Sequence, residues 1–415
     1  MQKGQKMISY FSKEERSILK VLSFGTFLEY FDVFLFIHLA TEISSTFFDI
    51  KNTSSFFIVS LAYLTTNLFR PIGAFVLGYL GDKIGRVFTL YLTMCTMGFC
   101  SLGMAILPSY AHIGIFASII VSLLRGLQSI SSMGEITSAR VFIQEHFKGN
   151  KKALACCILA IGCFAGGHSA VLLVQAALDY GVNFRWLFVV GFVILLVGLN
   201  FRKFLFENRE FTHRISKSEP KISLKLWIAA GSIVSMSQVL WSLCYIVLNQ
   251  YLRDHFNYSN VNIIDNNAII GWAYCFTFTA YFIANRYPAS ISLLKNLLLL
   301  GLICGMPLVF MSNPTAQNIV HLQFLLLLCA GDPTMECLVL ANTHVKRRVL
   351  MACTTFALPK FLVLAVLAIP QYLLPKYGML SYTIVCAPMV LFSIWGILTI
   401  RKIDLKNPDG LHKYY

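Results

Sequence analysis

The stretch "RPIGAFVLGYLGDKIGRVFTLYL", residues 70–92, decides the fold, because it joins two apolar runs through a short charged turn. Four charged residues, Arg70, Asp82, Lys83 and Arg86, interrupt it together with four glycines. Charged side chains at lipid depth are costly, so these four either leave the membrane or have partners inside it. The stretch therefore predicts two membrane-spanning helices that meet in a turn at one surface.

The composition extends this interpretation to the whole chain. Of its 415 residues, 57% are hydrophobic and only 13% charged, and the mean hydropathy is +0.68. A soluble domain of this size cannot bury so much apolar surface, and helices are the default in lipid because lipid offers no partner to a bare backbone group. About twelve apolar runs are long enough to cross a bilayer. The predicted spans are 17–40, 55–81, 86–107, 113–140, 152–178, 183–203, 226–252, 263–284, 289–311, 317–341, 349–374 and 379–400.

The net charge of +15 is distributed as in a membrane protein. With the N-terminus inside, about 23 Lys and Arg residues fall in cytoplasmic segments and about four outside, so both termini are expected in the cytoplasm. The basic face would contact anionic lipid headgroups. An RNA-binding patch is the weaker alternative, because no module of interleaved aromatic and basic residues accompanies it, and we expect no nucleic-acid partner.

The richest run of charge, "KFLFENREFTHRISKSEPKISLK" at residues 203–225, lies near the middle of the chain. Six predicted spans precede it and six follow. This arrangement predicts a six-helix bundle at 1–202, a cytoplasmic linker at 203–225 and a second six-helix bundle at 226–415. Transporters built from two such halves bind their substrate between them. The alternative is a twelve-helix protein without this symmetry. We expect a monomer.

The turn in the opening stretch carries a recognisable motif. "GYLGDKIGR" resembles the G-x-L-x-D-R-x-G-R signature of the major facilitator superfamily, with Lys83 at a position where Arg is usual. The resemblance implies a cytoplasmic gate that holds the outward-open state. The gate residues implied are Gly78, Asp82, Gly85 and Arg86, with Arg140 and Glu145 at the end of the fourth span.

Two further segments are similar to one family within that superfamily, the metabolite–proton symporters that include proline/betaine carriers. "GTFLEYFDVFLF", residues 25–36, is similar to its G-N-x-x-E-W-x-D-F stretch. "RGLQSISSMGEITSARVFIQE", residues 125–145, is similar to its R-x-x-Q-G-x-x-x-G-G-E stretch. The second half of the chain resembles the family only in its pattern of spans.

Ionisable residues inside these spans predict an ion or substrate route without the family name. Glu29 and Asp32 share one helix face, because they are three positions apart. Arg125, Gln128 and Glu135 belong to one polar stripe of the fourth span. Intramembrane charges usually face a cavity or a partner. We expect Glu29, Asp32, Arg125 and Glu135 to couple transport to protons; the alternative is a structural salt bridge between the first and fourth spans.

Three charges of the second half are candidates for substrate contact. Asp332 and Glu336 are four positions apart in the tenth span, and Lys360 lies in the eleventh. Opposed charges in a cavity would suit a zwitterion, and a structural pair of Lys360 with either acid is the alternative. Residues Tyr30, Gln128 and Tyr245 complete the predicted substrate cavity.

These features favour a secondary active transporter that takes up a small polar metabolite, either a zwitterion or an organic acid, with protons. A GxxxxGK[ST] loop is missing from the sequence, which disfavours an ATP-driven pump, and no nucleophile–base pair nominates an enzyme. Cofactors and metals are not expected, since the proton gradient supplies the driving force. A proton-coupled exporter and a non-transporting sensor are the alternatives. A bacterial inner membrane is the expected location.

Overall fold

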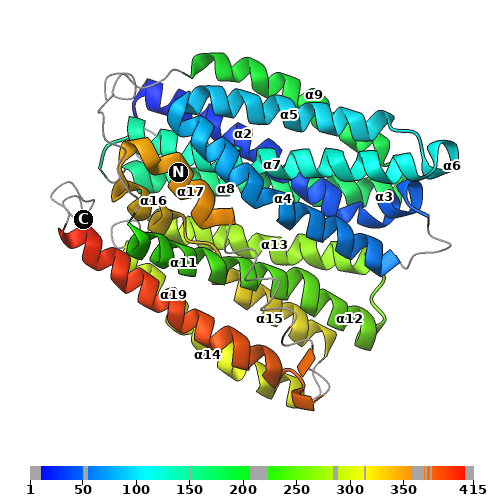
Figure 1. Ribbon diagram of the computed structural model, residues 1–415. Coiled ribbons are helices and arrows are strands. Elements are labelled where there is room, and N and C mark those ends of the chain that lie inside the picture. The colour runs from blue at the N-terminus through cyan, green and yellow to red at the C-terminus, as the bar shows by residue number, and fades with distance from the viewer. Residues whose placement is uncertain are drawn as a thin grey trace. The chain divides into compact units, whose positions relative to one another are not determined.

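The computed structural model describes most of the chain. The described residues are 11–49, 55–149, 151–205, 223–283, 288–312, 315–357, 369, 372–373 and 376–406, and within them all regular structure is helical. Two compact units account for these helices, Met1–Pro220 with Val345–Cys353, and Lys221–His344 with Thr354–Tyr415. Figure 1 shows most helices of each unit as long rods.

The first unit is built from paired helices. Its elements are α2 (Lys13–His38), α3 (Ala40–Phe47), α4 (Ser55–Lys83), α5 (Arg86–Ile106), α6 (Tyr110–Ile113), α7 (Ile115–His146), α8 (Lys151–Asp179), α9 (Arg185–Phe201) and the 3₁₀ turn η1 (Arg202–Phe204). Helix α2 packs on α8, and α7 packs on α4 and α5. Glycines permit these close approaches: a Cβ at Gly166 of α8 would collide with the backbone of Phe27.

The segment Val345–Cys353 belongs to the first unit, although it lies far along the chain. It contains the 3₁₀ turn η3 (Val345–Arg347) and the start of α17 (Arg348–Ala357), drawn in orange in Figure 1. Gly78 of α4 packs so closely on this segment that a Cβ there would come within 2.9 Å of the Leu350 Cα. The predicted boundaries assigned these residues to the second bundle, so the division of the chain differs at this segment.

The second unit contains two interrupted helices. Its remaining elements are α11 (Leu224–Ser242), the π-helix η2 (Leu243–Leu248), α12 (Asn249–Phe256), α13 (Asn260–Ile283), α14 (Pro288–Met311), α15 (Ala316–Leu328), α16 (Pro333–Ala341) and α19 (Leu380–Lys406). The first interruption is η2, which continues α11 into α12. The second separates α15 from α16 at residues 329–332, and Gly331 has a φ of 78° there.

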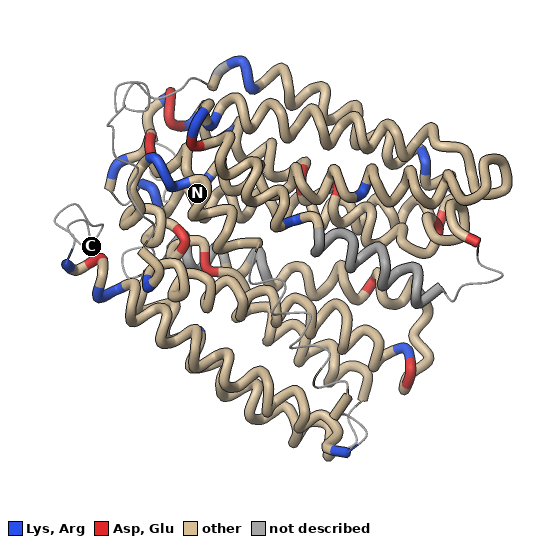
Figure 2. The backbone as a smooth tube through the Cα atoms, in the orientation of Figure 1, with Lys and Arg blue, Asp and Glu red and all other residues tan. Residues whose placement is uncertain are grey.

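Seven helices of the described residues are long and apolar enough to cross a membrane. They comprise three from the first unit and four from the second, two of which continue through the interruptions just described. Figure 2 shows that charged residues gather mostly at helix ends, with a smaller set within the helices of the first unit. The number of twelve spans and the cytoplasmic placement of both termini stay predictions.

Candidate functional site

The motif turn positions a buried arginine. Helix α4 ends at Lys83 and α5 begins at Arg86, and the intervening Gly85 has a φ of 141°, a conformation that favours glycine. The Arg86 side chain is fully buried. Its guanidinium donates to the Glu145 carboxylate at 2.9 Å and to the carbonyls of Val345 and Gly81, both at 2.8 Å. Arg86 thus ties α4, α7 and the segment 345–353 together.

Asp82 supplies the second contact of the turn. Its two carboxylate oxygens accept hydrogen bonds from the backbone N–H groups of Val349 (3.0 Å) and Leu350 (2.9 Å), at the start of α17. A carboxylate at this position satisfies amides that have no partner within their own helix, and it complements the positive end of the helix dipole. Of the predicted gate residues, Gly78, Asp82, Gly85, Arg86 and Glu145 therefore meet at one place; Arg140 lies half-buried on α7.

A second group of polar residues surrounds Asp32 on α2. The Asp32 carboxylate accepts hydrogen bonds from Ser101 Oγ at 3.0 Å and from Gln128 Nε2 at 2.7 Å. Gln128 in turn accepts from Arg125 at 3.3 Å, so the amide bridges the acid and the arginine. The Arg125 guanidinium also stacks over the Phe36 ring at 4.1 Å. All of these polar side chains are buried.

Glu135 has a partner that the sequence did not indicate. Arg202 of η1 forms an ion pair with Glu135 and also donates to the Leu90 carbonyl, while Thr93 donates to the other Glu135 oxygen at 2.8 Å. Arg202 and Glu135 are each 1% exposed.

The pairing of Arg202 with Glu135 was not predicted from the sequence. A buried arginine needs a counter-charge, and Glu135 supplies it from a helix far away in the sequence. The only available signal was the position of Arg202 at the end of an apolar run, which is equally typical of a residue at the membrane surface.

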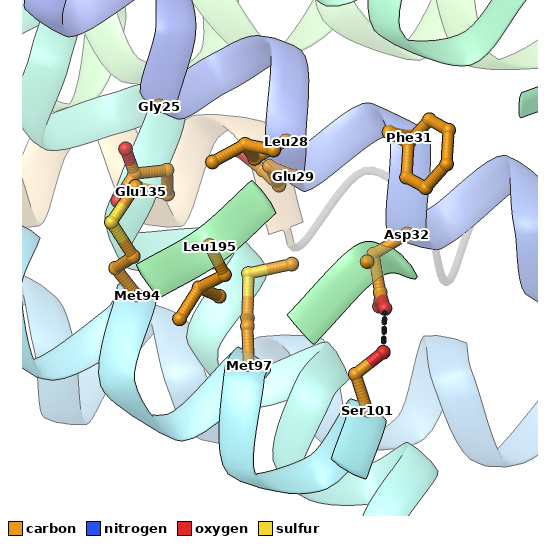
Figure 3. Close-up of a pocket in the computed structure, with 11 residues that line it drawn as sticks. Gly25, Leu28, Glu29, Phe31, Asp32, Met94, Met97, Ser101, Glu135 and Leu195 are labelled. Carbon is orange, nitrogen blue, oxygen red and sulfur yellow. Dashed lines mark hydrogen bonds between the residues drawn. The ribbon is translucent and has the colours of Figure 1, made fainter. Parts of the chain in front are cut away.

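A small cavity connects the two groups inside the first unit (Figure 3). Its lining comes from α2, α5, α7 and α9 and includes three buried carboxylates, Glu29, Asp32 and Glu135. Apolar side chains form the rest of the wall, with Leu28, Phe31, Met94, Met97 and Leu195. Three of the four residues predicted for proton coupling thus line one cavity, and Gln128 links the fourth, Arg125, to Asp32.

The predicted substrate residues of the second half are distributed differently. Asp332, at the break before α16, pairs with Lys295 of α14 at 3.1 Å and accepts a hydrogen bond from Ser292. Lys360, its expected partner, lies outside the described residues. Glu336 is half-buried one turn further along α16. Lys295 was not predicted as the partner of Asp332, because it falls in a span with no matched motif.

The aromatic members of the predicted cavity have aromatic neighbours. Tyr245, in the π-helix, packs against Trp241 with ring centres 4.9 Å apart. Tyr30 is half-buried on α2 and packs against Phe34 and Phe164 with ring centres 6.5 and 6.2 Å apart.

The interruption at η2 is accompanied by buried amides that sequence analysis also missed. Gln323 of α15 donates to the Cys244 carbonyl and to the Asn249 side chain, both at 2.8 Å, and it accepts from Asn266 at 2.9 Å. A π-helix changes the local backbone hydrogen-bonding pattern, and the Gln323 amide binds one of its carbonyls. Because these hydrogen bonds join η2, α12, α13 and α15, they hold the four elements together around the π-helix.

Comparison with known proteins decides the family. The family model described as Major Facilitator Superfamily matches residues 22–344. The chain belongs to the major facilitator superfamily. The superfamily resemblance is therefore confirmed, and this major facilitator protein is a multi-pass integral membrane protein of a transporter family, not of an enzyme class.

Curated relatives of this major facilitator protein are transporters. The proline/betaine transporter of Salmonella typhimurium is 28% identical over 270 residues, which cover 59% of this chain and 54% of the relative. The putative proline/betaine transporter of Staphylococcus aureus is 29% identical over 218 residues, covering 49% and 46%. The chain spans about half the length of the curated relatives it matches.

Solved structures share the fold of this major facilitator protein at low sequence identity. The proton:xylose symporter XylE is 12% identical with a TM-score of 0.76, and the match covers 93% of this chain and 95% of XylE. The human organic anion transporter MFSD10 (TETRAN) is 10% identical with a TM-score of 0.62, covering 94% and 100%. At such identities the likeness establishes the fold alone.

Proposed function

We propose that this protein is a proton-coupled symporter that imports a small zwitterionic metabolite across the bacterial inner membrane. The observation that carries the proposal is the position of Glu29, Asp32 and Glu135 around one cavity in the first unit, with Arg125 joined to Asp32 through Gln128. Buried carboxylates that can lose and regain a proton are the usual carriers of protons in membrane transporters.

The proposed coupling uses the charge of Asp32. When ionised, Asp32 accepts from Ser101 and Gln128, and the Arg125 guanidinium next to Gln128 balances its charge. Protonation removes the negative charge and leaves Arg125 without that balance, which changes the energy of the whole cluster. A proton gradient would thereby drive the first unit between an arrangement with ionised Asp32 and one with protonated Asp32.

A zwitterion is the favoured substrate class for two reasons. The relatives matched by the chain are named as proline/betaine transporters. In the second unit, the Lys295–Asp332 pair at a helix break offers one group of each sign, to which the carboxylate and the amine of an amino acid would bind. An organic acid would use Lys295 without Asp332.

The motif turn is the proposed cytoplasmic gate. The Asp82 carboxylate on the start of α17 and the Arg86–Glu145 pair would hold the segment 345–353 against the first unit and break during the transport cycle. Lys and Arg residues at the same surface would contact anionic lipid headgroups, with both chain termini in the cytoplasm.

Proteoliposomes with an imposed pH gradient test this function, with radiolabelled L-proline and glycine betaine as probes. We expect accumulation when the outside is acidic, and we expect D32N to abolish accumulation while it keeps exchange of the same probe across the membrane. Accumulation driven only by the opposite gradient would show that the protein is an exporter and would refute import. If wild-type protein neither accumulates nor exchanges either probe, the zwitterion symporter is refuted.

A further inference from the structure

The cavity of the first unit extends along helix α2, so its carboxylates could form a path for protons. It follows α2 from Gly25 through Glu29 to Asp32, a rise of roughly 10 Å at about 1.5 Å per residue. Figure 3 shows Glu135 beside Gly25 at one end and Asp32 with Ser101 at the other, with Met94, Met97 and Leu195 along the wall. Polar groups therefore stand at both ends and in the middle of an otherwise apolar passage.

The free space in this cavity matches about one water molecule. A buried water needs two to four polar partners, and the polar part of the lining consists of three carboxylates and Ser101 between apolar walls. One water, with a diameter of about 3 Å, cannot span the roughly 10 Å of α2 between Gly25 and Asp32. The carboxylate of Glu29, midway along α2, is the group that can complete the connection.

We propose that the cavity holds one water molecule which, with Glu29, carries protons between Asp32 and Glu135, and that Arg202 closes the Glu135 end. The inference rests on the proposed proton coupling and specifies its path. Each transfer breaks the O–H bond of one carboxylic acid or of the water and forms an O–H bond on the next oxygen, so no other reactant is needed.

The closed end follows from the contacts of Glu135. Arg202 donates to one of its oxygens and Thr93 to the other, so both oxygens already have a donor. Protonating Glu135 in this arrangement would leave the Arg202 guanidinium charged and buried without the charge of Glu135, which is strongly unfavourable. A proton therefore reaches Glu135 only when Arg202 moves away, and Arg202 acts as a positioning residue that prevents leakage.

Other ionisable groups surround the passage. Groups that interact electrostatically with Tyr30 or Asp32 of α2 are Glu29, Arg70, Cys100, Arg125, Arg140 and Cys163, and Arg202 pairs with Glu135. The titratable residues that line the cavity itself are Glu29, Asp32 and Glu135. The proposed path uses these three and no other titratable group.

Gly191 offers a specific way to block the water. An added Cβ would lie 3.4 Å from Ser101 Oγ and 3.8 Å from the Phe31 ring, which are ordinary contacts, so Gly191→Ala fits the fold while its methyl enters the cavity. Gly305 on α14 is the matched control, because a Cβ there meets nothing within 4 Å. Both substitutions exchange glycine for alanine within a helix.

We expect G191A to lower the rate of L-proline accumulation driven by a pH gradient by about tenfold. Proline exchange by G191A should equal that of wild type, and G305A should behave as wild type in both assays. Infrared difference spectra of the purified protein after a pH step supply a readout without substrate. They should contain a band of a weakly hydrogen-bonded water that G191A removes and G305A keeps. Wild-type accumulation by G191A, or a water band that survives in it, would overturn the path.

A double variant tests Arg202 and Glu135 separately from their structural role. E135Q/R202M removes both charges together, so no buried charge is stranded and the fold is kept. We expect proline exchange to persist and gradient-driven accumulation to be lost, because glutamine cannot accept the proton. Full coupling in the double variant would make the pair purely structural. If wild-type protein fails to couple while the infrared bands behave as expected, the proposed symport fails and the water path stands.

Discussion

The ion pair of Arg202 and Glu135 makes a quantitative prediction about stability. Both residues are 1% exposed, so bulk solvent does not reach Arg202 to replace Glu135 if that partner is removed. Breaking a buried pair by deleting one member costs about 3 to 5 kcal/mol of unfolding free energy, because the remaining charge is left uncompensated. R202M and E135Q should each fall in that range.

The double variant should behave differently from the sum of the two. Replacing a buried pair by neutral groups of similar volume is nearly neutral, so E135Q/R202M should lie within about 1 kcal/mol of wild type. The four stabilities form a double-mutant cycle of wild type, R202M, E135Q and E135Q/R202M. Its coupling energy would be several kcal/mol and opposite in sign to the effect of each single substitution. Lys203, the exposed neighbour of Arg202, is the control: K203M should change stability by less than about 0.5 kcal/mol.

Equilibrium unfolding in mixed micelles measures wild type and the four variants. Tryptophan fluorescence reports the transition, and the denaturant dependence should be similar for each variant if the unfolded states are alike. A loss of under about 1 kcal/mol in R202M would be the value of a solvated surface pair. That result would refute the buried pair and with it the closed end of the proposed proton path.

Three further predictions concern single contacts. D82N should weaken the cap on α17 by about 1 kcal/mol and speed hydrogen exchange there, with the exposed K83Q as control, and unchanged exchange would contradict the contact. G25A should destabilise the first unit by about 1 to 3 kcal/mol in thermal unfolding, because its Cβ would collide with the Arg202–Glu135 pair. The control G301A, whose Cβ would meet nothing within 4 Å, should not destabilise the protein, and equal effects of the two substitutions would refute this packing. K295M should abolish exchange of L-proline in proteoliposomes, and unchanged exchange would remove the Lys295–Asp332 pair from substrate binding.

The sequence allowed some features to be predicted because they depend on local pattern. Apolar runs of span length, the charged turn with its glycines and the shared face of Glu29 and Asp32 are all visible within a few helical turns. The glycines of the turn were also informative, since the conformation at Gly85 and the close approach at Gly78 are properties that only glycine supplies easily.

The partners of the buried charges were not predictable in this way. Glu135 pairs with Arg202 across 67 positions, Asp332 pairs with Lys295 across 37, and Asp82 binds amides more than 260 positions away. A basic residue at the end of an apolar run has the same sequence pattern whether it reaches the headgroups or turns inward. The ion pair between Arg202 and Glu135 was therefore not predictable from the sequence.

The sequence by itself determined that the chain is helical, that it lies in lipid, and which residues must avoid the acyl chains, because hydrophobicity and helical period act along the chain. Tertiary structure alone decided that three of those carboxylates surround one water-sized cavity, and that Glu135 pairs with Arg202 and Asp332 with Lys295. The physical reason is that the electrostatic cost of a buried charge depends on distances in space, and packing sets those distances among helices that are remote in sequence.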